Sequence, residues 1–272
     1  MMSFLFVWQT MIQAPLVIAS AAIGFATYFS YLVPLSAFGA KAVSGGVVVL
    51  IVILLYRRID AIGRISVLMW GGVVATLLWI IAGGLASGRF FEPLTNINEG
   101  LQLNFAFVSA LGFASVKSVY SYLGYYNVCH LGGEIVQPAK NIPKSMFLSI
   151  AGISVFYVAM NMSVVAVIPW QEARSSNFVI SLFMQRWLGD NAAIAVTVMV
   201  LWVAFASVFS ATLGYSRIPY AAATDGAFFK VFARLHPTRQ FPHVSLLLLG
   251  GLAFVFSLLF RLSEVISAIL AM

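Results

Sequence analysis

Residues Tyr120–Ile150 read YSYLGYYNVCHLGGEIVQPAKNIPKSMFLSI, and this stretch is the most informative part of the sequence about the fold. It starts as an aromatic, apolar segment that contains Gly124. It then passes through an acidic Gly-Gly-Glu and crosses a loop marked by Pro138 and Pro143, after which the chain becomes apolar again. Glycine weakens helices, and proline ends or begins them. The pattern therefore predicts an interrupted helix, a tight loop and a second helix.

The composition around this stretch is that of an integral membrane protein. Hydrophobic residues make up 62% of the 272 residues, charged residues only 8%, and the mean hydropathy is +1.00. A soluble domain of this length needs a far more charged surface. The apolar runs reach the roughly 20 residues that a helix needs to cross a ~30 Å hydrocarbon core. We therefore expect one all-α transmembrane domain over residues 1–272.

The apolar spans indicate about seven full transmembrane helices and a partial eighth. They cover residues 3–33, 41–56, 63–87, 101–129, 145–168, 191–222 and 244–260, and the incomplete one starts near 263. The net charge of +7 does not indicate nucleic acid binding, because the basic residues lie in short clusters between apolar runs. Alternate loops are richer in Lys and Arg, which places them on the cytoplasmic side. The apolar spans and the charged loops together indicate a protein embedded in the lipid bilayer.

The loop over 169–191 carries a second pattern. Its apolar residues recur at helical spacing: Phe178, Leu182, Phe183, Trp187 and Leu188. This spacing predicts a short amphipathic helix. Such a helix lies either at the membrane interface or over an outer vestibule, and the sequence does not separate the two.

Residues 117–127, KSVYSYLGYYN, gather polar side chains around Gly124 in the middle of a span. In hydrocarbon every polar group needs a partner inside the protein, so this density predicts a broken helix that lines a cavity. A tyrosine-rich interfacial belt is the alternative interpretation. Lys117 is the most costly of these residues in a membrane. It either takes part in function or only snorkels or pairs structurally.

Other polar residues suggest weaker hypotheses. Ser207 and Ser210 lie within a span, where their hydroxyls either face an ion or substrate or bond back to their own helix. Gating or structural roles are predicted for a set of loop residues: Glu134, Pro138, Asn141, Pro143, Arg217 and Asp225. The chain has one cysteine, and its three histidines lack ligand partners at suitable spacing. We expect no metal site, no cofactor and no enzymatic activity.

Two motifs resemble the amino acid–polyamine–organocation (APC) transporter superfamily, in particular bacterial amino acid permeases of the L-type-like branch. The first is the sixth-helix core with its loop: Tyr120, Tyr122, Gly124, Tyr125, Glu134, Ile135, Pro138, Asn141, Ile142 and Pro143. The second is an eighth-helix ending: Ser216, Arg217, Tyr220, Ala223, Asp225 and Gly226, followed by His236-Pro237 and Pro242. Both occur in the expected order with the expected helices between them.

The resemblance implies a fold of two inverted five-helix repeats, with the substrate between the broken first and sixth helices. In that register the chain runs from the third helix into the tenth. It would then lack the Gly-rich first-helix segment that receives the substrate carboxylate in the family. We therefore interpret the sequence as an incomplete LeuT-like transporter domain, part of a longer permease. An eight-helix protein is the alternative.

The resemblance also implies the function. We expect a multi-pass permease of the plasma membrane that moves amino acids by alternating access, either by secondary active transport or by exchange. A coupling proton or sodium ion is a further expectation. The alternatives are a polyamine or organic cation carrier and a non-transporting membrane subunit. Scarce acidic residues inside the spans argue against a polycation carrier.

The predicted substrate site is Tyr120, Ser121, Tyr122 and Gly124, with Lys117 beside it. Backbone groups at the break would bind the charged end of the amino acid, and the Tyr120 ring would act as a gate. Many relatives carry a lysine on the fifth helix near the position of Gly72 or Val73, where it occupies a cation site. Residues 65–88 contain no Lys or Arg. We therefore hypothesise that Lys117 supplies the missing charge.

Overall fold

The computed structural model describes residues 2–57, 59–95 and 104–271, without the side chains at 59, 60, 61, 117 and 134. Within these residues all regular structure is helical, and five helices are long and apolar enough to cross a membrane. They are α1 (Met2–Leu32), α2 (Ala37–Leu55), α3 (Ile59–Ala86), α8 (Pro138–Val167), and α11 (Asp190–Tyr215) continued by α12 (Ile218–Thr224). The predicted all-α membrane fold is confirmed.

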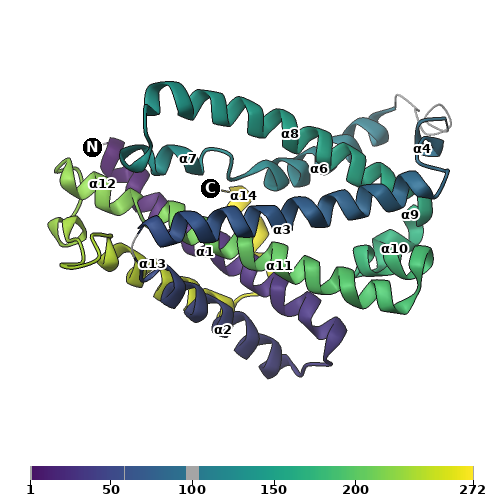
Figure 1. Cartoon of the computed structure of the whole chain (residues 1–272), viewed down its shortest axis with the longest axis horizontal. Coiled ribbons are helices and arrows are strands. Elements are labelled where there is room, and N and C mark those ends of the chain that lie inside the picture. The colour runs from purple at the N-terminus through teal and green to yellow at the C-terminus, as the bar shows by residue number, and fades with distance from the viewer. Residues whose placement is uncertain (1, 58, 96–103, 272) are drawn as a thin grey trace.

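Four helices form the main core. α1 packs against α2, α11 and α13 (His243–Leu259), and α13 also packs against α2. Figure 1 shows these helices side by side, with α14 (Leu262–Ala271) behind them. Their shared interior holds fully buried Ile18, Ile51, Phe209 and Leu249. Alanines at several buried positions of α1 let the helix backbones approach closely, as is usual between membrane helices.

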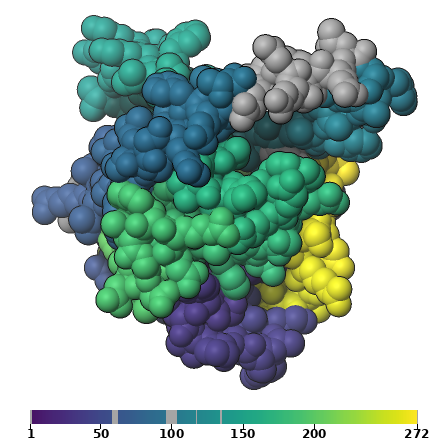
Figure 2. All heavy atoms as spheres, turned by 90° about the vertical axis from the view of Figure 1, so that its right-hand side faces the viewer, coloured from purple at the N-terminus to yellow at the C-terminus, as the bar shows by residue number. Residues whose placement is uncertain are grey.

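A second layer consists of α3, α8 and two short helices. The predicted amphipathic helix is present as α10 (Val179–Leu188), and another short helix, α9 (Trp170–Ser175), precedes it in the same loop. Phe183 of α10 is fully buried and packs with Ile80 of α3 and Val164 of α8. The apolar face of α10 therefore covers protein. Figure 2 shows the end of the molecule that lies on the right in Figure 1, with green α10 and α11 below the blue-to-teal α3 and α6.

The predicted break divides the span over 101–129, of which residues 104–129 are described, into two helices. α6 (Phe105–Tyr122) begins after Asn104, whose side chain accepts a hydrogen bond from the Phe107 amide at 2.8 Å. α7 (Asn127–His130) follows after a turn, and η1 (Gly132–Glu134) leads towards α8. Most residues of α6 are exposed in the chain. Its C-terminal end, in contrast, is held by contacts with α1, α8 and α14.

Candidate functional site

The helix break lies where the sequence predicts it. α6 ends at Tyr122, and Leu123 turns to extended backbone with φ −63° and ψ 138°. Gly124 follows with φ +113°, a conformation that side-chain-bearing residues rarely adopt. The chain then re-forms a helical turn at Asn127. A glycine at this position allows the backbone to leave the helix inside the span.

The break leaves backbone groups without helical partners. The Ser121 carbonyl accepts a hydrogen bond from the Tyr157 hydroxyl of α8 at 2.8 Å, and the Tyr120 carbonyl accepts one from the Leu123 amide at 3.2 Å. The N–H groups of Gly124, Tyr125 and Tyr126 make no hydrogen bond within the described part of the chain. The turn therefore offers donors next to the carbonyl end of α6.

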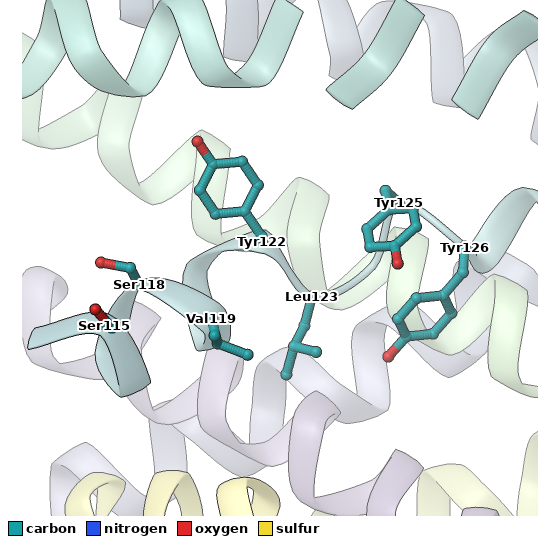
Figure 3. A pocket seen from close by; sticks show the side chains of 7 residues that line it. All are labelled: Ser115, Ser118, Val119, Tyr122, Leu123, Tyr125 and Tyr126. Atoms are coloured by element: carbon teal, nitrogen blue, oxygen red, sulfur yellow. The ribbon is translucent and has the colours of Figure 1, made fainter. Parts of the chain in front are cut away.

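A cavity of about 350 Å³ lies along the same segment (Figure 3). Its lining comes from α6 and the turn: Ser115, Ser118, Val119, Tyr122, Leu123, Tyr125 and Tyr126. These seven side chains are hydroxylated, aromatic or aliphatic, and none of them carries a charge at neutral pH. Such a lining suits a small molecule whose buried part is neutral.

Among the predicted substrate residues whose side chains the structure describes, Tyr122 lines this cavity. Its ring makes an edge contact with the Tyr157 ring of α8 at a centroid distance of 5.3 Å. Its hydroxyl donates to Ser154 Oγ at 3.2 Å. In Figure 3 the Tyr122 ring points away from Val119 and Leu123, towards the ribbon of α8. Two contacts with α8 therefore fix this part of the cavity wall.

Tyr120 points to the opposite side of α6. Its hydroxyl is 2.8 Å from Ser20 Oγ of α1, a residue that is 3% exposed. Its ring packs on an apolar cluster that includes Leu16 of α1 and Val265 of α14. Tyr120 thus anchors α6 to α1 rather than lining the cavity, and a gating role for its ring stays a prediction.

Tyr126 joins the cavity to the main core. Its hydroxyl lies 3.2 Å from the Tyr215 hydroxyl near the end of α11. Tyr215 is 3% exposed and belongs to the core around α1 and α11. The ring of His130 lies against both tyrosines, at centroid distances of 5.9 Å from Tyr126 and 5.5 Å from Tyr215. A movement of α7 would therefore change both the cavity wall and its contact with α11.

The two serines proposed for an ion or second site lie on α11 and are exposed in the chain. The Ser207 hydroxyl donates to the Val203 carbonyl one turn earlier, at 2.9 Å. This contact matches the alternative in which the hydroxyl bonds to its own helix. The cavity lining contains neither Ser207 nor Ser210. The structure therefore gives no geometric support to an ion site at this pair.

The loop after the break has the local geometry of a helix start. Pro138 occupies the first turn of α8, where its missing N–H costs nothing, and Pro143 follows within the helix. The Asn141 side-chain amide donates to the Val136 carbonyl at 2.6 Å. Glu134, for which a gating or structural role is also predicted, is placed by its backbone only, because its side chain lies outside the described residues.

Arg217 and Asp225 lie at the two ends of α12. Arg217 is 6% exposed, and its Nη1 donates to the Leu213 carbonyl at 3.1 Å and to Ser216 Oγ at 2.9 Å. These bonds satisfy groups at the carbonyl end of α11, where a positive charge is favourable. Asp225 ends α12 and is exposed. The arrangement supports a structural role for Arg217, and a gating role for either residue stays a prediction.

The sequence pattern contained a signal for the cavity residues that the site prediction missed. Ser115, Ser118 and Tyr122 recur at helical spacing, and this spacing places them on one face of α6. The prediction included Tyr122 but omitted Ser115 and Ser118. Tyr157 and Tyr215, which fix the break from α8 and α11, carry no local signal.

An indole lies against Gly72 of α3, near which the resemblance implies a lysine in relatives. The Trp202 side chain of α11 lies on Gly72, and a Cβ built at Gly72 would be 2.1 Å from the indole Nε1. That Nε1 donates to the Met69 carbonyl at 3.2 Å. Val73 is partly buried against the main core. Lys117, the proposed substitute, is placed by its α6 backbone only, because its side chain lies outside the described residues.

Comparison with known proteins decides the family. The family model described as amino acid permease matches residues 1–272. The chain belongs to the amino acid permease family. This confirms the predicted membership of the APC superfamily, and with the helices described above it makes the protein a multi-pass membrane protein.

Several curated proteins are similar to this permease chain. It is 24% identical over 251 residues to the uncharacterized amino acid permease YecA of Bacillus subtilis (strain 168), covering 92% of this chain and 57% of that protein. It is 32% identical over 181 residues to the large neutral amino acids transporter small subunit 2 of Mus musculus, covering 65% and 33%. It is 27% identical over 193 residues to cationic amino acid transporter 4 of Mus musculus, covering 70% and 29%. The chain thus spans between 29% and 57% of the length of these relatives.

Proposed function

We propose that this permease moves amino acids across the plasma membrane by alternating access, as a secondary active transporter or an exchanger, without covalent chemistry. The family match and the transporters among its relatives support this proposal. The observation that carries it is the broken helix, because α6 and α7 are separated at Gly124 beside an uncharged cavity.

The break suits the charged ends of an amino acid. The last carbonyls of α6 carry the negative end of the helix dipole, which favours an ammonium group. The amide N–H groups of Gly124, Tyr125 and Tyr126 are available as donors to an oxygen of the substrate or to water. A zwitterion uses both kinds of group. A polyamine needs only acceptors, preferably carboxylates, and the described residues of the cavity lining provide no carboxylate.

The cavity favours amino acids with neutral, apolar or aromatic side chains. Tyr122, Tyr125 and Tyr126 provide aromatic surface, and none of the lining side chains that the structure describes can pair with a charge. A charged substrate side chain buried against these residues would exchange hydration for contacts without an opposite charge. The names of the relatives include large neutral and cationic amino acids, so they leave this choice open. In our proposal the lining residues determine the preference for neutral over charged amino acids.

Counterflow into proteoliposomes that contain the full-length protein tests this proposal. We expect labelled phenylalanine and leucine to exchange, and lysine and glutamate to be at least about tenfold slower, a ratio worth ~1.4 kcal/mol. Empty liposomes are the control. Exchange of spermidine in preference to any amino acid would support the polycation carrier. Uptake of no amino acid and no polyamine would support a non-transporting subunit.

A separate variant tests the role proposed for Lys117. If its charge replaces the lysine missing near Gly72, Lys117→Met should weaken apparent substrate affinity about fivefold or more and change the pH profile of exchange. The matched control is Lys41→Met, which removes an exposed lysine from the second turn of α2. Unchanged affinity together with an unchanged pH profile would refute the hypothesis.

A further inference from the structure

A compact polar cluster lies where α7 meets α11. His130, at the end of α7, places its ring against the Tyr126 and Tyr215 rings, and the two tyrosine hydroxyls are 3.2 Å apart. Asn127, one helical turn before His130, packs on Gly214 of α11, where a built Cβ would be 3.3 Å from the Asn127 Cβ. Of these residues only Tyr126 also lines the cavity.

Two buried polar atoms in this cluster have no hydrogen-bond partner among the described residues. They are Nδ1 of His130 and Oδ1 of Asn127. Their residues are three positions apart in α7, so they lie on the same side of that turn. Buried polar atoms normally have partners, and an unpartnered one is therefore a candidate for binding a ligand or a proton. Imidazole is the side-chain group whose ordinary pKa lies closest to neutral pH, so His130 Nδ1 is the better candidate of the two for binding a proton.

The charged and titratable groups around His130 are few. From the same segment come Tyr126 and Cys129, and the Cys129 thiol faces Met146 of α8 at 3.6 Å. From α11 comes Tyr215, and the Arg217 guanidinium is bonded to the end of that helix. The remaining groups lie on neighbouring elements: Lys140 and Lys144 of α8, which are exposed, and Glu134 of η1, whose side chain lies outside the described residues.

We propose that His130 is a proton-binding site, and that its protonation opposes amino acid binding at the cavity. The proposal rests on the proposed transport function. Its geometric basis is Tyr126, which lines the cavity and at the same time contacts His130 and Tyr215. A proton at His130 therefore acts on the cavity through one shared side chain.

The sign follows from burial. His130 lies just beyond the predicted span that ends at residue 129, and burial lowers the pKa of its imidazole below the ordinary value. The neutral form is therefore favoured in the packed cluster, and acidification through that lowered pKa places a charge in it. The free-energy cost of this buried charge falls when α7 moves and exposes the imidazolium to water. Such a movement of α7 separates Tyr126 from Tyr215. The cavity wall is then lost, and by reciprocity a bound amino acid disfavours the proton.

Binding of labelled phenylalanine to the purified full-length protein between pH 5.5 and 8 tests the coupling. We expect the wild-type Kd to rise about fivefold or more as the pH falls from 7.5 to 5.5. In His130→Gln we expect the Kd to change by less than about twofold over the same range. Tyr215→Phe keeps the ring and removes the hydroxyl. It should weaken binding at pH 7.5 towards the wild-type value at pH 5.5.

Two control variants separate His130 from other groups. His236→Gln replaces a histidine in the loop before α13, and Glu134→Gln neutralises the nearest carboxylate in sequence. Both should keep the wild-type pH dependence. A wild-type Kd that is constant or falls on acidification overturns the proposal. An equal pH dependence in wild type and His130→Gln, or its loss in Glu134→Gln alone, does so as well.

Thermal unfolding provides a readout that needs no substrate. Because the folded-state pKa of His130 is lowered, the unfolded chain binds more protons as the pH falls below about 6.5, and stability decreases there. The Tm of wild type and His236→Gln should fall more between pH 7.5 and 5.5 than the Tm of His130→Gln. An equal fall in all three would refute proton binding at His130. Absence of phenylalanine binding with the expected Tm pattern would instead count against the proposed substrate.

Discussion

Replacing Gly84 with leucine is expected to reduce the yield of folded protein by about tenfold or more. Gly84 lies where α3 crosses α8, and a Cβ built on it would be 2.2 Å from both Cβ and Oγ of Ser163. The same Cβ would be 2.5 Å from the Ser163 Cα, which belongs to the backbone and cannot rotate away. Ser163 is fully buried. The two helices must therefore separate to admit any side chain, and this would disrupt the second layer.

Yield of monodisperse protein and Tm in detergent measure the effect. The matched control is Gly71→Leu on the same helix, because a Cβ there meets nothing within 4 Å. Gly84→Ala should lower stability by about 1–3 kcal/mol, and Ser163→Gly in the same chain should recover part of that loss. Normal yield and Tm in Gly84→Leu would show that α3 and α8 are not in close contact at Gly84 and Ser163.

The helices could be predicted from the length of the apolar runs, but their ends could not. The span predicted from 41 begins at Ala37, because Ser36 caps the helix and Lys41 lies inside its first turns. The span predicted from 145 begins at Pro138, since proline is accepted in a first helical turn. In both cases the helix extends beyond the apolar run, and hydropathy marks the membrane rather than the helix end.

The break was predictable because its cause is local. Gly124 among polar side chains indicates an interruption without any knowledge of the neighbouring helices. The partners of the break are not local. Tyr120 meets Ser20, a residue 100 positions away, and Tyr126 meets Tyr215, which is 89 positions away. Which tyrosine faces the cavity and which faces α1 depends on these contacts, so the sequence alone does not separate Tyr120 from Tyr122.

Replacing Gly124 with alanine is expected to weaken amino acid binding between about fivefold and 150-fold while the protein stays folded. Gly124 has φ +113°, where a residue with a Cβ is strained by about 1–3 kcal/mol. The effect is not a clash, because the nearest atom to a built Cβ is the Asn127 Nδ2 at 3.6 Å. The strain is relieved when the turn moves towards helical backbone. The α6 carbonyls and the N–H groups of the turn would then bond to each other instead of to substrate.

Gly112→Ala is the matched control for this variant. Gly112 lies in the same helix with helical backbone and open space around it, so alanine there should be neutral or slightly stabilising. The Kd for labelled phenylalanine and the Tm should be measured for both variants. A Kd unchanged in Gly124→Ala, with Tm also unchanged, would mean that the break is not part of the binding site. A Kd that rises in Gly124→Ala and not in Gly112→Ala would mean that the backbone conformation of the turn is needed to hold the substrate.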